Sequence, residues 1–213
     1  MRYSREYIEN MMREIPETAF RLFVQKGIAN VTMQNIADAA HYAVASLYRH
    51  YGTKRSLVIQ IAVQQWTLVA QESEQAYAEA GGPGFTACQE LEFYLSSYVY
   101  LYREKKDLLK FNSDFDQYIL LEEPEEEEIK PYMNMLSCFT RSFHERYAKA
   151  YEDHSIRTDI PEQQVYFGMM YTMMSAAARF AYGTVYPFEG ADFVAALEMQ
   201  KDAYLHYMTP KTN

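Results

Sequence analysis

Residues 32–51 read TMQNIADAAHYAVASLYRHY, and this stretch decides the fold class. Thr32 predicts the start of a short helix over Met33–Ala40, because a hydroxyl at the N-cap can accept a hydrogen bond from the first-turn backbone. A second short helix is predicted over about residues 43–50, before Gly52. Only the His41-Tyr42 pair separates them. Two short helices with a tight connection are typical of a helix-turn-helix, whose second helix enters the major groove of DNA.

The second short helix has the composition that a helix in the major groove requires. Val44 and Leu47 can anchor it to a core. The groove is about 12 Å wide and admits one helix, so the opposite face has to be small or polar. The side chains expected on that face are Ala43, Ala45, Ser46, Arg49 and His50.

Longer helices are predicted on both sides of this motif. The first, over residues 5–26, carries apolar residues at helical spacing, although Pro16 should kink it or cost it a hydrogen bond. Its apolar positions are Ile8, Met12, Ile15, Ala19, Leu22 and Phe23. After the motif, Thr53 is expected to cap a long helix from Lys54 to about Ala80, followed by a break at Gly81–Gly84. The remaining helices are expected at about 86–104, 106–121, 131–152, 159–182 and 192–208.

The fold class expected from this pattern is all-α, with about nine helices. Residues 1–53 are expected to form a three-helix DNA-binding head that contains the helix-turn-helix. Residues 54–213 are expected to form a helical body for ligand binding and dimerisation.

The charge distribution agrees with such a division. The net charge of the chain is −9. Residues 1–55 nevertheless hold eight Lys or Arg against five Asp or Glu, a net charge of +3, and the remainder holds 12 against 24, a net charge of −12. A basic head on an acidic body is the distribution expected if the head contacts the phosphates of DNA.

Other features favour an ordinary cytoplasmic protein. Cys88 and Cys138 are too few for a disulfide framework, and the N-terminus lacks the apolar segment of a signal peptide. The longest uncharged run, residues 163–178, is too short and too polar to be a good membrane span. The acidic run at residues 122–128 is expected to be a solvated loop or helix start. We expect no metal, no cofactor and no membrane partner.

The first part of the chain, from about Ile8 to Ile61, resembles the TetR family of bacterial repressors. The matching residues are Ala19, Leu22, Phe23, Gly27, Val31, Thr32, Met33, Ile36, Ala37, Ala40, the run Ser46–Tyr51, Lys54 and Leu57. The run Ser46–Tyr51 followed by Lys54 is the most specific part. The sequence departs from the family in the turn, where His41-Tyr42 replaces the usual Gly. It has Ala45-Ser46 where Gly-Thr is common, and Ala43 where Ser is common.

The resemblance implies roles for individual residues. Thr32 and Gln34 would lie near phosphate at the start of the first motif helix, and Tyr48, His50 and Lys54 would contact the DNA backbone. Val44, Ala45, Ser46 and Arg49 would be the candidates for base-edge contacts. For Tyr48 and Tyr51 the alternative is packing in the core, which we favour for Tyr51 but not for Tyr48.

The resemblance further implies a homodimer on double-stranded operator DNA, released by a small organic ligand. The interface is expected on the last two helices, unless these are ordinary core helices; its candidates are Met169, Met173, Ala177, Phe180, Phe193, Leu197 and Tyr204. The pocket candidates, which could equally be plain core, are Tyr94, Tyr98, Phe111, Phe115, Tyr118, Met135, Phe139, Phe143 and Met170. Asn112, Asp114, Asp116 and His144 could supply polar groups, and an acidic group near aromatic rings favours a cationic, lipophilic ligand.

Two other classes of function are open to the sequence. An all-α enzyme is disfavoured, since none of the five histidines follows Glu by three residues, and the chain contains no Gly-rich phosphate loop. We therefore expect no catalytic residues. A helical ligand-binding or scaffolding protein without specific DNA binding is the second alternative, supported by the acidic total charge and the unusual turn.

Overall fold

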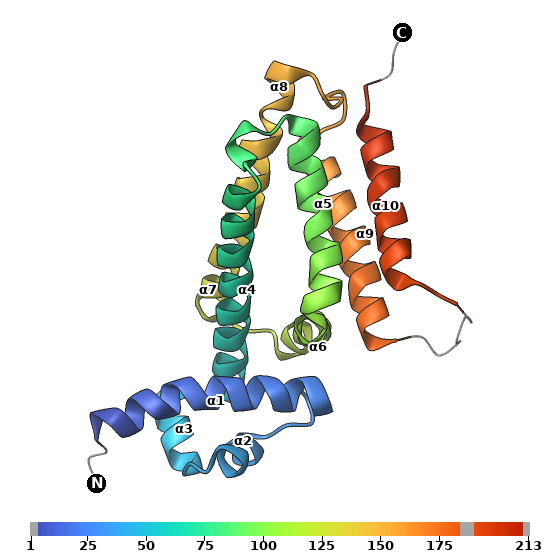
Figure 1. Cartoon of the computed structure of the whole chain (residues 1–213). Helices are drawn as coiled ribbons and strands as arrows, with labels where there is room; N and C mark the ends of the chain where they lie inside the picture. Colours follow the sequence, from blue (N-terminus) through green and yellow to red (C-terminus); the bar gives the residue numbers. More distant parts are fainter. Residues whose placement is uncertain (1–3, 184–189, 211–213) are drawn as a thin grey trace. The chain divides into compact units, whose positions relative to one another are not determined.

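The computed structural model describes residues 4–183 and 190–210, and within these ranges it contains helices and no strand (Figure 1). The expected all-α class is confirmed. The described residues form ten α-helices and a short 3-10 helix. The four-residue helix α8, Ala150–Asp153, is the addition to the expected set.

The chain divides into two compact units. The first contains residues 4–66 and 110–134, and therefore extends beyond the expected boundary at residue 53. The second contains residues 67–109 and 135–210, of which 184–189 lie outside the described residues.

The first unit is built from complete and partial helices. They are α1 (Arg5–Lys26), α2 (Met33–Ala40), α3 (Val44–Tyr51), the start of α4 (Lys54–Glu79), most of α6 (Lys106–Glu122) and the start of α7 (Glu126–Tyr147). Its core is apolar, and includes Ile15 of α1, Ile36 of α2, Leu47 of α3 and Phe111 of α6, each at most 1% exposed.

Helix α1 runs unbroken through Pro16, whose ring is buried. Its buried side passes through Met11, Ile15 and Ala19. The expected inward positions Ile8 and Met12 are exposed. The buried stripe is thus rotated by one residue at this end of the helix, because i, i+4 spacing from Ile15 leads back to Met11.

The acidic run between α6 and α7 is more than a solvated loop. Arg55 in the first turn of α4 donates from Nη2 to Glu128 Oε2 at 2.6 Å and from Nη1 to the Glu122 carbonyl at 3.1 Å. Ser56 Oγ donates to Glu128 Oε1 at 3.2 Å. The arginine lowers the pKa of the Glu128 carboxyl. This Arg55 clamp ties the α6–α7 connection to the helix that follows the helix-turn-helix.

The second unit consists of the remaining helical segments. They are the end of α4, the 3-10 helix η1 (Gly82–Gly84), α5 (Ala87–Glu104), the start of α6, the end of α7, α8, α9 (Glu162–Tyr182) and α10 (Phe193–Met208). Helices α5, α9 and α10 pack against one another (Figure 1). The predicted break at Gly81–Gly84 is confirmed by the end of α4 at Glu79 and by η1.

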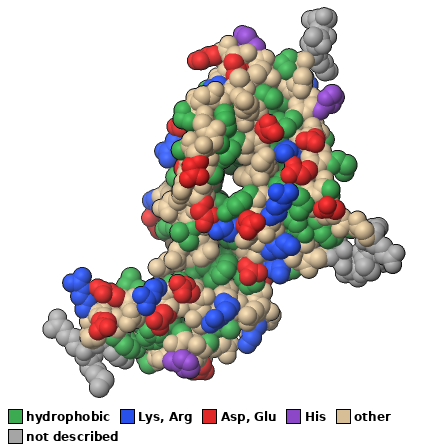
Figure 2. Space-filling view, viewed as in Figure 1, with side chains coloured by type: hydrophobic (Ala, Val, Ile, Leu, Met, Phe, Trp, Pro, Cys, Tyr) green, Lys and Arg blue, Asp and Glu red, His purple; other side chains and the backbone are tan. Residues whose placement is uncertain are grey.

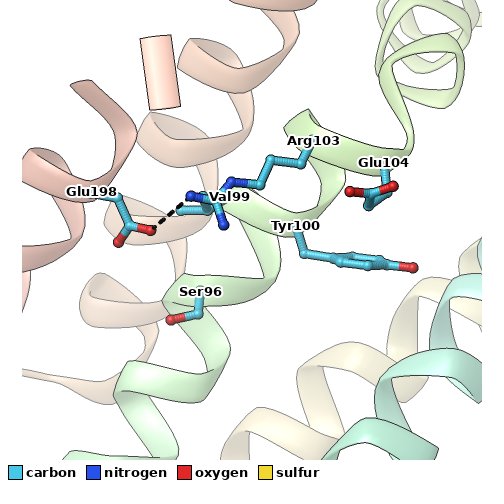
Figure 3. Close-up of a pocket in the computed structure, with 6 residues that line it drawn as sticks. All are labelled: Ser96, Val99, Tyr100, Arg103, Glu104 and Glu198. Atoms are coloured by element: carbon cyan, nitrogen blue, oxygen red, sulfur yellow. Dashed lines mark ion pairs between the residues drawn. The ribbon is translucent and has the colours of Figure 1, made fainter. Parts of the chain in front are cut away.

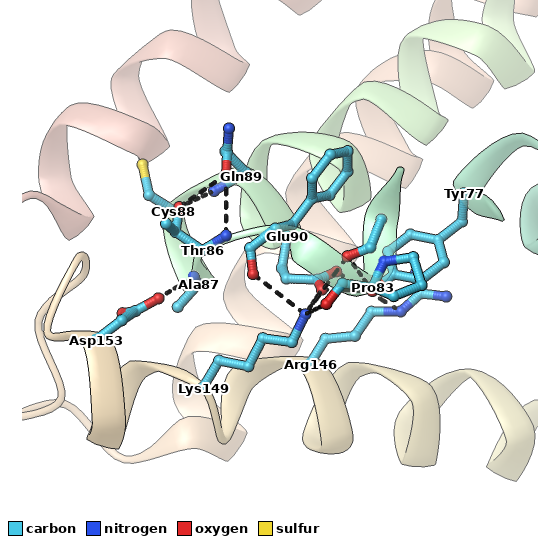
Figure 4. A network of polar contacts seen from close by, with 12 residues as sticks. Tyr77, Pro83, Thr86, Ala87, Cys88, Gln89, Glu90, Arg146, Lys149 and Asp153 are labelled. Carbon is cyan, nitrogen blue, oxygen red and sulfur yellow. Dashed lines mark hydrogen bonds and ion pairs between the residues drawn. The ribbon is translucent and has the colours of Figure 1, made fainter. Parts of the chain in front are cut away.

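A polar network joins the ends of α4, α5 and α7 in this unit (Figure 4). Glu90 is 3% exposed and pairs with the ammonium of Lys149. Lys149 Nζ also donates to the Phe85 carbonyl at 3.2 Å, and the Tyr77 hydroxyl lies 2.5 Å from Glu90 Oε1. The guanidinium of Arg146 covers the Tyr77 ring at 3.9 Å from its centroid. A buried carboxylate is tolerated here because cations and donors surround it.

Candidate functional site

The start of α2 is capped as the sequence predicted. The Thr32 hydroxyl accepts from the Asn35 N–H at 3.1 Å, and Asn35 Oδ1 accepts from the Thr32 N–H at 3.0 Å, which makes a reciprocal capping box. Thr32 and Gln34 are both exposed. The Gln34 amide donates to Asp38 Oδ1 at 2.6 Å. This end of α2 is therefore open to solvent, where the partial positive charge of a helix N-terminus favours an anion.

The His41-Tyr42 turn, which lacks the glycine usual in the family, is held by contacts between Tyr42 and two side chains of α1. His41 adopts the left-handed conformation, with φ 60° and ψ 36°. The next residue, Tyr42, donates from its N–H to the Ala37 carbonyl at 2.9 Å. Its hydroxyl donates to Glu14 Oε2 at 2.8 Å, and its ring meets the Tyr7 ring edge-on at 5.3 Å between centroids. Contacts from Tyr42 to α1 thus hold the turn in place although His41 adopts a backbone conformation that only glycine adopts without strain.

Helix α3 presents one face to solvent and one to the core. Leu47 is fully buried and Tyr51 is buried, as expected. Ala45, Arg49 and His50 are exposed, and Tyr48 is 52% exposed.

Two of the side chains expected to contact DNA are less accessible than the sequence suggested. Ser46 is 2% exposed and lies in the core, because α3 buries positions 46 and 47 together against its neighbours. Lys54 is half-buried, and its ammonium donates to the Ala29 carbonyl at 3.4 Å and lies over the Tyr118 ring at 5.1 Å. Burial lowers the pKa of Lys54. Val44 is half-buried, so only part of it is accessible.

The surface over α1 differs from this face. Basic and acidic side chains alternate over α1 (Figure 2), and Arg5 pairs with Glu9 at 2.8 Å while Arg13 lies 3.4 Å from Glu14. Such pairs neutralise each other at the surface, which makes α1 a poor contact for phosphate. The exposed face of α3 and the start of α2 are the better candidates for DNA contact.

Residues 15–61 match the model of a family described as bacterial regulatory proteins, tetR family. This segment of the chain is therefore similar to the tetR family. The matched segment begins within α1 and ends in α4, and so contains the whole helix-turn-helix. No curated protein sequence matches the chain.

Solved structures of this fold span nearly the whole chain. A tetR-family regulatory protein from Rhodococcus RHA1 is 16% identical with a TM-score of 0.71, covering 94% of this chain and 97% of its own. A putative transcriptional regulator from Saccharomonospora viridis, in complex with choline, is 15% identical with a TM-score of 0.73, covering 95% and 100%. The regulator FadR from Bacillus subtilis, in complex with stearoyl-CoA, is 13% identical with a TM-score of 0.64, covering 91% and 97%. These likenesses show that the chain shares the fold of these three proteins over nearly its whole length.

The aromatic residues expected to line a pocket fall into both units. Phe111 and Phe115 of the first unit are each 1% exposed, and Phe111 packs against Phe20 at 5.2 Å between centroids. Both are therefore core residues, which was the alternative to a pocket-lining role. Tyr118 lies beneath Lys54, and burial raises the pKa of its hydroxyl to about 12.

In the second unit the structure brings three candidates together. Tyr94 contacts Phe143 at 4.9 Å between ring centroids, and the Tyr98 hydroxyl donates to the Tyr94 hydroxyl at 2.6 Å. Burial raises the pKa of both tyrosines, so both stay neutral. Tyr166 of α9, which the sequence did not single out, joins them at 5.0 Å from Phe143. The other candidates are Met135, which is buried, and Phe139 and Met170, which are half-buried.

The second unit also has a surface pocket that no sequence pattern indicated. It is an open hollow of about 390 Å³ between α5 and α10 (Figure 3). Arg103 Nη2 lies 3.8 Å from Glu198 Oε1 across it. Its lining residues are Ser96, Val99, Tyr100, Arg103, Glu104 and Glu198. None of these is among the expected pocket residues, and the lining mixes polar and apolar surface.

Four of the expected interface residues are buried within the chain. Met169, Met173 and Ala177 lie on the core side of α9, and Leu197 lies on the core side of α10. They are unavailable to a partner, because one chain already covers them. Phe180 and Phe193 are half-buried and stack at 4.6 Å on each other, and Tyr204 donates to the Gly168 carbonyl at 3.3 Å.

Within residues 4–183 and 190–210, no group of three or more His, Cys, Asp or Glu is placed to hold a metal ion. In the same ranges no helix is long and apolar enough to cross a membrane.

Proposed function

We propose that this chain is a repressor that binds operator DNA as a homodimer and leaves it when a small organic ligand binds. The observation that carries the proposal is the exposed face of α3, with Ala45, Tyr48 and Arg49 beside the solvent-facing start of α2. A small residue allows the helix backbone to approach base edges, and an arginine can donate two hydrogen bonds to guanine. The tyrosine hydroxyl is suited to phosphate.

The dimer is supported by exposed apolar side chains on neighbouring helices. Tyr171 of α9 is 63% exposed and Met199 of α10 is 68% exposed, and these two helices pack against each other. Exposed apolar residues on both also include Phe167, Tyr182 and Tyr207. A two-fold interface uses the same surface on both protomers. We therefore propose that the interface uses the exposed face of α9, opposite the face that carries the buried Met169 and Met173.

Ligand control is supported by regulators of the same fold with small molecules bound, namely choline in one and stearoyl-CoA in another. A ligand that favours a different conformation from the DNA-bound one weakens binding at both half-sites together.

The test is operator binding by the purified protein, measured by fluorescence anisotropy over a range of salt on DNA upstream of its own gene. Arg49→Ala should lower affinity for the preferred sequence by 1–3 kcal/mol, or about 5- to 150-fold. Arg21→Ala removes the same charge from the exposed side of α1 and is the matched control. Tyr48→Phe should reduce affinity for all sequences alike. Binding without sequence preference, or equal loss in both arginine variants, would contradict the proposal and favour a scaffolding role.

Dimerisation is tested separately by light scattering. Met199→Glu places a charge in the proposed interface and should give monomers, whereas Leu120→Glu changes an exposed apolar residue of α6 and should not. A dimer that tolerates Met199→Glu would place the interface elsewhere.

A further inference from the structure

We propose that Asp116 in the first unit recognises the positive charge of the regulatory ligand, and that this ligand is an organic cation with apolar groups around its charge. The inference rests on the proposed function, because it names the class of molecule that the regulator senses. It is carried by a chain of contacts from α4 through α6.

The carboxylate of Asp116 is held in place by a relay. Trp66 of α4 donates from Nε1 to Asn112 Oδ1 at 2.9 Å. The same amide donates from Nδ2 to Asp116 Oδ2 at 3.3 Å, one turn further along α6. Because the indole fixes which end of the amide is the acceptor, the amide NH₂ has to face the carboxylate. The relay orients Asp116 without neutralising its charge.

No cation in the described parts of the chain compensates this carboxylate. Among these residues no Lys, Arg or His forms an ion pair with Asp116, and its side chain is exposed. Surrounding protein atoms nevertheless raise its pKa to about 6 by removing water. The titratable group beside it on α7 is Tyr132, whose hydroxyl has its pKa raised mainly by burial and further by Asp116. An accessible but poorly hydrated charge of this kind gains from a cationic partner.

The surroundings select the kind of cation. One carboxylate and one amide supply too few oxygen ligands for Ca²⁺, and Mg²⁺ surrenders its water reluctantly. The protein around Asp116 is aromatic: Trp66 and Tyr132 are buried near it, and the Phe115 ring packs at a tilt against the Tyr132 ring, at 4.6 Å between centroids. An alkylammonium ion has a diffuse charge and an apolar shell, so it loses little hydration in such surroundings. Anions are disfavoured by charge.

Binding at this site can be followed by tryptophan fluorescence, because Trp66 is the single tryptophan of the chain. Its indole is hydrogen-bonded to Asn112, and Asn112 is hydrogen-bonded to Asp116. The probe is pentyltrimethylammonium, with 3,3-dimethylbutanol as a control whose tert-butyl group is the neutral isostere of the charged head. A saturable change in Trp66 emission is expected with the cation and not with the alcohol. Asp116→Asn should weaken cation binding at least ten-fold. Asp107→Asn removes an exposed acid from the start of α6 and should leave it unchanged.

The pH dependence gives a second measurement on the wild-type protein. A carboxyl with a pKa of about 6 is about one-tenth ionised at pH 5, so the affinity for the cation should fall about ten-fold between pH 7.5 and pH 5. Asp116→Glu keeps the charge but moves it, and should bind with intermediate affinity and the same direction of pH dependence. Thermal unfolding of each variant confirms that it is folded.

The outcomes separate this inference from the proposed function. Absence of cation binding, or binding that Asp116→Asn leaves intact, overturns the inference even if operator binding is established. Asp116-dependent cation binding supports the inference even if the protein binds no operator, in which case the proposed function fails. Release of a preferred operator by the cation, lost in Asp116→Asn, would support both.

Discussion

Replacing Tyr42 by Phe tests whether the helix-turn-helix is held by its contact with α1. The substitution keeps the ring that packs on Tyr7 and removes only the hydroxyl that donates to Glu14 at 2.8 Å. Helix α3 begins at Val44, two residues after the tyrosine. The hydrogen bond is thus the last side-chain tether of the turn before the recognition helix.

The size of the effect follows from the chemistry of the bond. A hydrogen bond to a charged group contributes about 1.5–3 kcal/mol to stability when it is well shielded. Tyr42 is half-buried and Glu14 can be rehydrated after the change, so the free energy of unfolding should fall by about 1 kcal/mol. Burial, and then the bond to Glu14, raise the pKa of Tyr42 to about 12. The stabilisation is therefore complete below pH 10 and is lost as pH rises through 12.

The assay is urea unfolding at neutral pH, arranged as a double-mutant cycle with Glu14→Gln. Each single variant should lose about 1 kcal/mol, and the double variant should lose little more than one of them. Tyr151→Phe removes a hydroxyl from an exposed tyrosine and should change stability by less than about 0.5 kcal/mol. Operator affinity of Tyr42→Phe should fall about 3- to 10-fold because α3 is less firmly placed. Strictly additive losses, or unchanged operator affinity, would refute the reasoning.

Three further substitutions test the strain, the isolated charge and the clamp. His41→Gly should raise the free energy of unfolding by about 0.5–1 kcal/mol, since Gly adopts φ 60° without steric cost, and a lower melting temperature would contradict this. Asp116→Asn should be about 1 kcal/mol more stable than wild type at pH 7.5, after discounting for exposure. Because the folded pKa is raised to about 6, the wild-type carboxyl costs no stability below about pH 4 and becomes costly as pH rises through 6, so the gain should disappear in acid. A gain that is constant with pH would exclude the charge as its cause. Arg55→Ala should cost about 1–2 kcal/mol, since two acidic-run contacts are lost together, whereas Lys130→Ala breaks an exposed pair and should be neutral in thermal unfolding. Equal losses of stability in Arg55→Ala and Lys130→Ala would mean that the Arg55 clamp does not stabilise the fold.

Local patterns determined the helix-turn-helix. The Thr32 cap, the limits of α2 and the buried Leu47 follow from interactions within a few residues, which sequence spacing records directly. The exposed positions Tyr48 and Arg49 follow from the same periodicity. The unusual His41-Tyr42 turn was visible as a departure, but its tether to Glu14 joins residues 28 apart and needed the packed α1.

Which face of a helix is inward was decided by tertiary packing. Helix α9 is apolar nearly all round, so its composition could not tell Met169 and Met173, which are buried, from Tyr171, which is exposed. Ser46 shows the same limit in α3, where a polar residue lies in the core.

Contacts between distant charges were also beyond the sequence. Arg55 and Glu128 are 73 residues apart, and the acidic run alone indicated only a solvated segment. Asp116 could be named as an acid near aromatic residues, but its isolation from every described cation depends on how three helices meet. The sequence by itself determined the helices, the motif and the family resemblance, because these depend on short-range periodicity and capping. The tertiary structure alone decided which surfaces are open, which charges are paired and which are left for a partner, because burial and electrostatic pairing depend on neighbours far along the chain.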